Sequence, residues 1–136
     1  MTYYFSVIGQ FLECTNSKKV IVSDSVNYHT AHFTIDSSLE GYNKSAIFTN
    51  TRTKVSVIKP LDVDNNCIIP FEPLVGEGYL DVCIKATLDT SVLYTDMGVQ
   101  LVIYQSGKTD ASDPLPPSQS VYDEILEIAL KKNVAE

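Results

Sequence analysis

The sequence of 136 residues has little positive charge, and this limits its partners. Ten lysines and arginines are outnumbered by seventeen aspartates and glutamates, so the formal net charge is −7. A nucleic-acid-binding protein needs a basic surface to displace the counterions around phosphates. We therefore expect no nucleic-acid partner.

The sequence also lacks a long hydrophobic run and an export signal. No apolar segment approaches the ~18 residues that a membrane-spanning helix requires. The opening residues MTYYFSVIGQFLEC have neither the basic n-region nor the small-residue cleavage site of a signal peptide. With 44% hydrophobic and 20% charged residues, the composition is typical of one soluble domain with a single core. We expect synthesis in a cytoplasm and no membrane partner.

Cysteine is scarce, and its spacing is uninformative for metal binding. The three residues Cys14, Cys67 and Cys83 form no CxxC pair, which leaves a zinc site without support. An odd number of thiols in a cytoplasmic chain favours free cysteines over a disulfide. Cys83 lies in the alternating segment YLDVCIKA and is predicted to be a small buried residue.

Other metal signals are weak. His29 and His32 are three residues apart in an apparent strand, where such positions point to opposite faces, so we predict partly exposed histidines. The turn LDVDNN begins like a calcium loop, but Cys67 and Pro73 stand where an EF-hand needs Gly and Glu. A turn between strands accounts for the Asp and Asn residues. No metal and no cofactor are predicted.

Catalytic motifs are missing as well. The GEG at 76–78 lacks the Lys-Ser/Thr of a phosphate-binding loop, and nothing resembles GxSxG. We therefore predict that the protein is not an enzyme. Tyrosine is abundant, with eight residues, and tyrosines can stack on sugars or anchor interfaces. Strand residues with their hydroxyls at the edge of the core explain the tyrosines more simply.

Residues 1–105 read as strands and turns. Alternating apolar residues and β-branched content favour seven to eight short antiparallel strands, separated by polar turns. The fold class predicted from this pattern is mainly β, a β-sandwich, with a turn or short helix in SSLEGYNKS. The expected strands cover residues 3–9, 18–24, 29–36, 44–50, 53–59, 66–71, 78–88 and 94–105.

A Pro-rich linker at 106–117 and a C-terminal helix at 118–136 complete the predicted organisation. Three of the six prolines lie at 114, 116 and 117, which favours an extended, semi-rigid spacer. Ser120 and Asp123 resemble a capping box at the start of the helix.

The apolar residues of this helix cover more than half of its circumference, which suits burial against several neighbours. A single helix of about 16 residues is marginal alone in water, so it packs on its own domain or on other copies. The spacer favours the second option, an oligomerisation helix, and leaves a helix docked on the sandwich as the alternative. The candidate oligomerisation residues are Val121, Tyr122, Ile125, Leu126, Ile128 and Ala129.

The order of short motifs resembles the N-terminal domain of tailed-bacteriophage upper baseplate proteins and related fibre proteins. The resemblance covers about residues 20–130, each motif being short and degenerate. The corresponding residues are Phe33 and Ile35; Leu39, Gly41, Lys44, Ala46 and Phe48; Asp62 to Pro70; Gly78 to Val82; Thr95 and Asp96; Ser106 and Gly107; and the Pro-rich linker with Tyr122 to Leu126.

This resemblance implies a non-enzymatic virion structural protein, a short fibre, head decoration or baseplate adaptor. It implies a β-sandwich that docks on a capsid or baseplate protein, and a C-terminal helix that associates in a bundle, often a trimer. Related fibre proteins continue beyond the helix into coiled coil and receptor-binding domains, whereas this sequence ends at Glu136. The alternative function is a carbohydrate-binding module that contacts host-surface glycans through exposed tyrosines, although the lack of Trp argues mildly against it.

Overall fold

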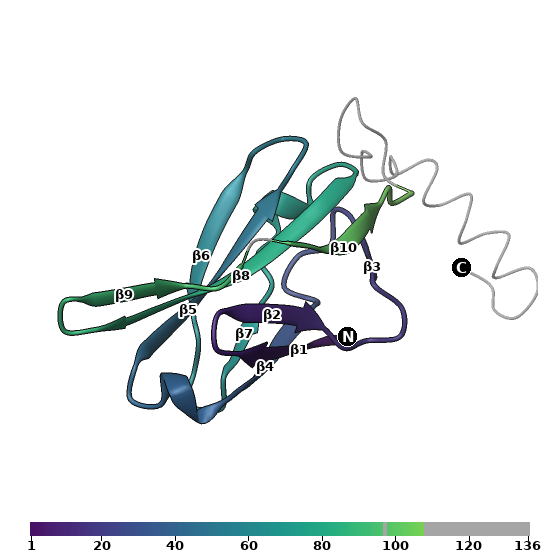
Figure 1. The fold of residues 1–136 in the computed structure, drawn as a ribbon. Helices are drawn as coiled ribbons and strands as arrows, with labels where there is room; N and C mark the ends of the chain where they lie inside the picture. The colour runs from purple at the N-terminus through teal and green to yellow at the C-terminus, as the bar shows by residue number, and fades with distance from the viewer. Residues whose placement is uncertain (97, 108–136) are drawn as a thin grey trace, which may run out of the picture.

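The protein is mainly β, and its strands form two sheets around one core in a computed structural model (Figure 1). The structure describes residues 1–96 and 98–107. The first sheet has the order β2-β1-β4-β7, and the second has the order β3-β10-β8-β5-β6, with β9 also paired to β8. The strands are β1 (Thr2–Ile8), β2 (Phe11–Cys14), β3 (Val20–Val22), β4 (Thr30–Ile35), β5 (Asn43–Asn50), β6 (Ser56–Pro60), β7 (Asn66–Ile68), β8 (Gly78–Leu88), β9 (Ser91–Tyr94) and β10 (Gly98–Tyr104).

The described residues form ten strands where seven to eight were predicted, because two short strands were not recognised. The segment FLEC forms β2, which follows β1 through a turn in which Gly9 has a φ of +61°. The strand β9 follows β8 through Asp89 and Thr90, and Asp89 has a φ of 52°. Both turns are only two residues long, and FLEC and residues 91–93 lie outside the predicted strands.

The prediction that all strands are antiparallel is wrong for two pairs. Strand β1 runs parallel to β4, and β10 runs parallel to β3. These pairs join segments that are distant along the chain, and parallel strands need a long connection between them. The short helix expected in SSLEGYNKS is confirmed as a single 3-10 turn, η1 (Ser37–Leu39).

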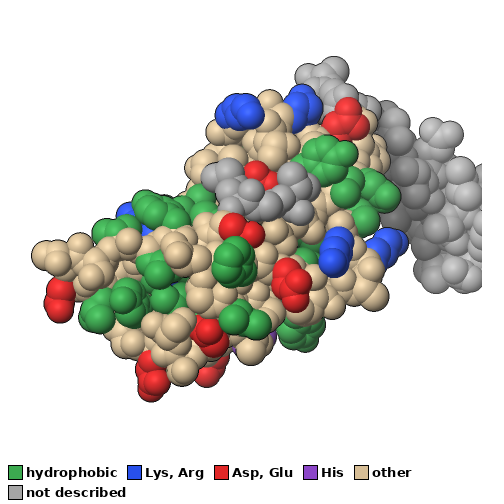
Figure 2. All heavy atoms as spheres, in the orientation of Figure 1, with side chains coloured by type: hydrophobic (Ala, Val, Ile, Leu, Met, Phe, Trp, Pro, Cys, Tyr) green, Lys and Arg blue, Asp and Glu red, His purple; other side chains and the backbone are tan. Residues whose placement is uncertain are grey.

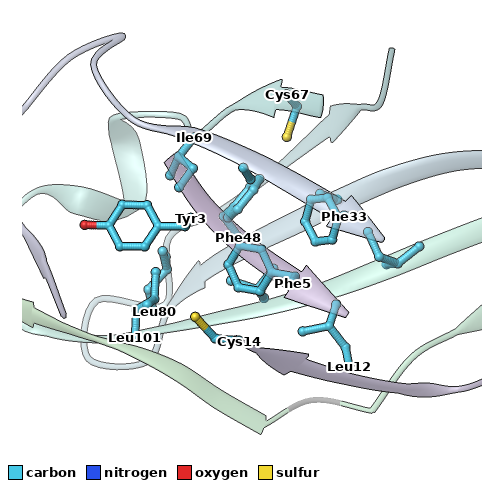
Figure 3. Packing of buried hydrophobic residues seen from close by; sticks show 14 of the residues in the cluster. Tyr3, Phe5, Leu12, Cys14, Phe33, Phe48, Cys67, Ile69, Leu80 and Leu101 are labelled. Atoms are coloured by element: carbon cyan, nitrogen blue, oxygen red, sulfur yellow. The ribbon is translucent and has the colours of Figure 1, made fainter. Parts of the chain in front are cut away.

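The core lies between the two sheets and follows the alternation of the strands. Tyr3 and Phe5 point inward from β1, Phe33 from β4 and Phe48 from β5, and all four are almost completely buried. The rings of Phe5 and Phe33 are stacked, with centroids 4.9 Å apart. Figure 3 shows these aromatic rings with the neighbouring aliphatic side chains of the cluster.

One edge of the first sheet is joined to the second by side-chain hydrogen bonds. The backbone N–H of Leu12 donates to Oδ1 of Asp96 at 2.8 Å, and the N–H of Cys14 donates to Oε1 of Gln100 at 3.1 Å. The N–H of Asp96 in turn donates to the carbonyl of Gln10 at 2.7 Å. The first two bonds pair backbone N–H groups of β2, the edge strand of the first sheet, which would otherwise lack a partner.

Candidate functional site

A surface site with a well-defined geometry lies at one end of the second sheet, where β5 ends and β8 begins. Asn50, the last residue of β5, is completely buried. Its Oδ1 accepts hydrogen bonds from the backbone N–H groups of Arg52 and Thr53, at 2.8 and 3.2 Å. Its Nδ2 donates to the carbonyl of Pro73 at 3.0 Å. Asn50 therefore fixes the turn that carries Arg52 against the segment that precedes β8.

Two glycines make room for Arg52. The guanidinium lies against Gly76, so that a Cβ added there would collide with Nη2. A Cβ at Gly78, which has a φ of +145°, would lie 2.8 Å from Oδ1 of Asn50 and 3.3 Å from Cβ of Arg52. The Nε–H of Arg52 donates to the carbonyl of Glu77 at 2.8 Å. The guanidinium is thus held in one place by backbone geometry, and no ion pair with another described residue contributes.

Two tyrosines stand beside this arginine. Tyr79 on β8 is 50% exposed, and Tyr104 near the end of β10 is 55% exposed. The register pairs Tyr79 with Val102, so Tyr79 and Tyr104 are diagonal neighbours on the outer face of the second sheet. Together they line a groove of about 600 Å³, which we call the Arg52 groove; its lining includes Arg52, Glu77, Tyr79, Val102 and Tyr104.

The chemistry of the Arg52 groove suits recognition. A guanidinium presents a planar fork of donors that matches a carboxylate, and tyrosine rings provide flat apolar surfaces with a polar end. Its lining has no histidine, cysteine or serine that would act as a base or nucleophile. Across residues 1–96 and 98–107, no group of three or more His, Cys, Asp or Glu side chains is arranged to hold a metal ion.

The prediction that both histidines are partly exposed is confirmed for His32 and is wrong for His29. His32 lies on the outer face of the first sheet, where its Nδ1 is 2.6 Å from Oδ1 of Asn66. His29 precedes β4 and is only 5% exposed. Its ring makes edge contacts with Tyr3 and Tyr28, and within the described chain neither ring nitrogen has a hydrogen-bond partner. Burial lowers the pKa of His29 below its ordinary value of 6.5.

We expect His29 to make stability depend on pH. The folded state resists protonation of His29, whereas the unfolded state takes up the proton as the pH falls below about 6.5. The free energy of unfolding should therefore have its full value above that pH. Below it, the free energy of unfolding should decrease by at most about 1.4 kcal/mol per pH unit for one proton. Urea unfolding followed by circular dichroism between about pH 7.5 and about pH 5.5 measures this slope.

The matched control for this experiment is the second histidine. His32→Gln should keep the slope, because His32 lies on the outer face, whereas His29→Phe should remove it. A wild-type protein with no slope across this range would show that His29 is solvated in the folded state.

The calcium-like turn is a turn between strands, as predicted. Oδ1 of Asp62 accepts hydrogen bonds from the N–H groups of Asp64 and Asn66, both at 2.9 Å. The carbonyl of Asp62 accepts from the N–H of Asn65 at 3.0 Å, and Asn65 has a φ of 61°. This is the way in which Asp side chains stabilise a reversal of the chain.

The prediction of buried free thiols is confirmed for all three cysteines. Cys14, Cys67 and Cys83 are buried and unpaired. Burial raises the pKa of each thiol, that of Cys67 to about 11. Their thiolate forms, which are the reactive ones, are therefore scarce at neutral pH.

The tyrosines follow the core-edge interpretation only in part. Tyr3 is buried and its hydroxyl donates to the carbonyl of Val20 at 2.8 Å, as that interpretation requires. Five others are about half exposed or more: Tyr4, Tyr28, Tyr79, Tyr94 and Tyr104. Figure 2 shows hydrophobic side chains on the visible face, both over the β8–β9 hairpin and beside the end of β10.

Sequence reasoning missed Arg52. The only signal in the sequence that could have indicated Arg52 is that it is the single arginine. Its partners Glu77, Tyr79 and Tyr104 are at least 25 residues away along the chain, so no local motif joins them. The predicted oligomerisation residues Val121, Tyr122, Ile125, Leu126, Ile128 and Ala129 lie outside the described residues, as do the Pro-rich linker from 108 onward and the C-terminal helix.

Comparison with known proteins does not assign the chain to a family. No model of a known protein family matches it, and a search of curated proteins finds no significant match. Among the described residues, no helix is both long and apolar enough to cross a membrane.

Proposed function

We propose that this protein is a non-enzymatic structural protein of a tailed-bacteriophage virion, as a short fibre, a head decoration or a baseplate adaptor. Its β-sandwich docks on a capsid or baseplate protein, and a C-terminal helix at 118–136 forms homo-oligomers, with a trimer favoured. In this proposal the protein is made in the bacterial host cytoplasm and becomes part of the virion.

The observation that carries the proposal is the exposure of large apolar side chains on the outer faces of both sheets. Ile8 and Phe11 are opposite each other in the register of β1 and β2, and both are exposed. Tyr79 and Tyr104 are exposed on the second sheet. Exposed apolar side chains gathered into patches with a polar rim are typical of protein interaction surfaces.

The motifs of the phage resemblance also fit this proposal, because four of their apolar residues lie in the core of the two-sheet unit. Phe33, Leu39, Ala46 and Phe48 are all buried in one cluster. Such residues preserve a fold, and this is consistent with a shared docking domain. The function itself rests on the resemblance and on the exposed surfaces.

The assembly part of the proposal is tested by the mass of the full chain in solution. Replacing Ile125 and Ile128 together by Glu places two charges in the apolar set of the predicted helix, where burial of unpaired charge is costly. We expect wild type to be an oligomer and the double variant to be a folded monomer, measured by light scattering and circular dichroism.

A matched control is Glu124→Gln with Glu127→Gln, which changes two charges outside the apolar set. This control should keep the oligomer. Equal masses for wild type and the Ile125→Glu, Ile128→Glu variant would contradict the assembly proposal. The Pro-rich spacer and helix would then serve another purpose, such as docking on their own sandwich.

The second candidate function is glycan binding at the host surface, and the exposed tyrosines favour it. Tyr79 and Tyr104 present rings next to a guanidinium, which is a combination that can stack on a sugar and bind its hydroxyl or carboxyl groups. Binding on a glycan array that disappears in Tyr79→Ala would support this candidate. An array without signal would remove it.

A further inference from the structure

Arg52 offers hydrogen-bond donors that match a carboxylate. The Nε–H of Arg52 is used by the carbonyl of Glu77, and within the described chain its two terminal nitrogens make no hydrogen bond. Gly76 and Gly78 leave space for the side chain, and Asn50 fixes its backbone. An exposed arginine normally loses considerable side-chain entropy on binding, and a positioned one loses less. The fixed position therefore favours binding at this point.

The walls of the groove suit proline. Tyr79 and Tyr104 are both about half exposed on one face, and Val102, two residues before Tyr104 on β10, is directly opposite Tyr79. Proline-rich segments dock into aromatic-lined grooves, because their extended conformation is already formed before binding. A matching ligand would carry prolines for the two rings and one acidic residue for Arg52.

The chain itself contains such a segment. Residues 110–117 read DASDPLPP, with Asp113 directly before the first proline. The segment carries two negative charges and no positive charge, and it is thus complementary to the arginine.

The point at which the chain leaves the sheet lies at the end of this groove. Ser106 lies two residues after Tyr104, and its hydrogen bonds hold it in place. Its N–H donates to Oγ of Ser23 at 3.0 Å, and its hydroxyl donates to Oδ2 of Asp24 at 2.7 Å. From Ser106 to Asp113 an extended chain spans at most ~25 Å. A tether this short raises the effective concentration of the segment at the groove to the millimolar range.

We propose that the Arg52 groove binds the acidic Pro-rich segment 110–117 of its own chain. The carboxylate of Asp113 meets the terminal nitrogens of Arg52, and the prolines that follow pack on Tyr79 and Tyr104. This contact would fix the direction in which the C-terminal residues leave the domain. It does not depend on the virion proposal, because it concerns the chain alone.

The test is paramagnetic relaxation in the full chain. Ser118→Cys places a thiol directly after the last proline, and a nitroxide label reacts there, because the three native thiols are buried and have raised pKa values. We expect the amide signals of Gly78, Tyr79 and Val102 to lose most of their intensity. Arg52→Gln should restore much of that intensity, and Lys54→Gln, an exposed cation of the same turn, should not.

A second variant tests the segment without changing the groove. Asp113→Asn together with Ala at Pro114, Pro116 and Pro117 should restore the same signals. Full intensity at Gly78 and Tyr79 in the labelled wild-type background would overturn the proposal, and so would a loss of intensity that Arg52→Gln leaves unchanged. Mixing an isotope-labelled chain without nitroxide and an unlabelled chain with nitroxide, both carrying Ile125→Glu and Ile128→Glu so that they stay monomeric, should give no loss. A loss in that mixture would assign the groove to the segment of a second copy, and so would overturn the assignment to its own chain.

Discussion

Phe48→Ala is expected to destabilise the protein by about 3–5 kcal/mol. The side chain of Phe48 is 0% exposed, and its neighbours in the register are Val57 on β6 and Val82 on β8. Removing the ring loses its transfer free energy and leaves a cavity that a packed two-sheet core fills only in part. This is a large share of the ~5–15 kcal/mol that usually separates folded from unfolded domains.

Urea unfolding followed by far-ultraviolet circular dichroism measures this loss, since the chain has no Trp for fluorescence. Phe11→Ala is the matched control, because Phe11 is 72% exposed on the outer face of the first sheet, and it should cost much less. A Phe48→Ala variant within about 1 kcal/mol of wild type would mean that the two sheets do not share a close-packed core.

Asn50→Ala is expected to cost about 2–4 kcal/mol, although the residue is polar. Its side chain makes three hydrogen bonds, to the N–H groups of Arg52 and Thr53 and to the carbonyl of Pro73. Pro73 is buried, so its carbonyl loses a partner that water replaces poorly. Urea unfolding followed by circular dichroism measures this loss in the free energy of unfolding.

Two variants sharpen this prediction. Asn50→Asp keeps the acceptor but loses the donor to Pro73 and buries a negative charge, so it should be no more stable than Asn50→Ala. Ser56→Ala removes the exposed hydrogen bond to Thr49 nearby and should cost less than about 1 kcal/mol. If Asn50→Ala and Ser56→Ala lowered the free energy of unfolding equally, the buried hydrogen bonds of Asn50 would stabilise the fold no more than an exposed one does.

The strand pattern was predicted where each strand alternates over several residues. The segments around Phe33 and Phe48 were recognised, and both residues are in the core. The short strands β2 and β9 were missed, because the alternation of only four residues is too short to indicate a strand. His29 was placed in a strand and is instead buried before one, since the nearby rings of Tyr3 and Tyr28 enclose it.

The sequence by itself determined the mainly β class, the free cysteines and the turn at Asp62. Each of these follows from local composition or from alternation along one segment, which depends on the two faces of a strand and not on its partners. Only the tertiary structure decided the order of the strands, the two parallel pairs and the Arg52 groove. All three features depend on pairing between segments that are distant along the chain. Such pairing is determined by how the whole core packs.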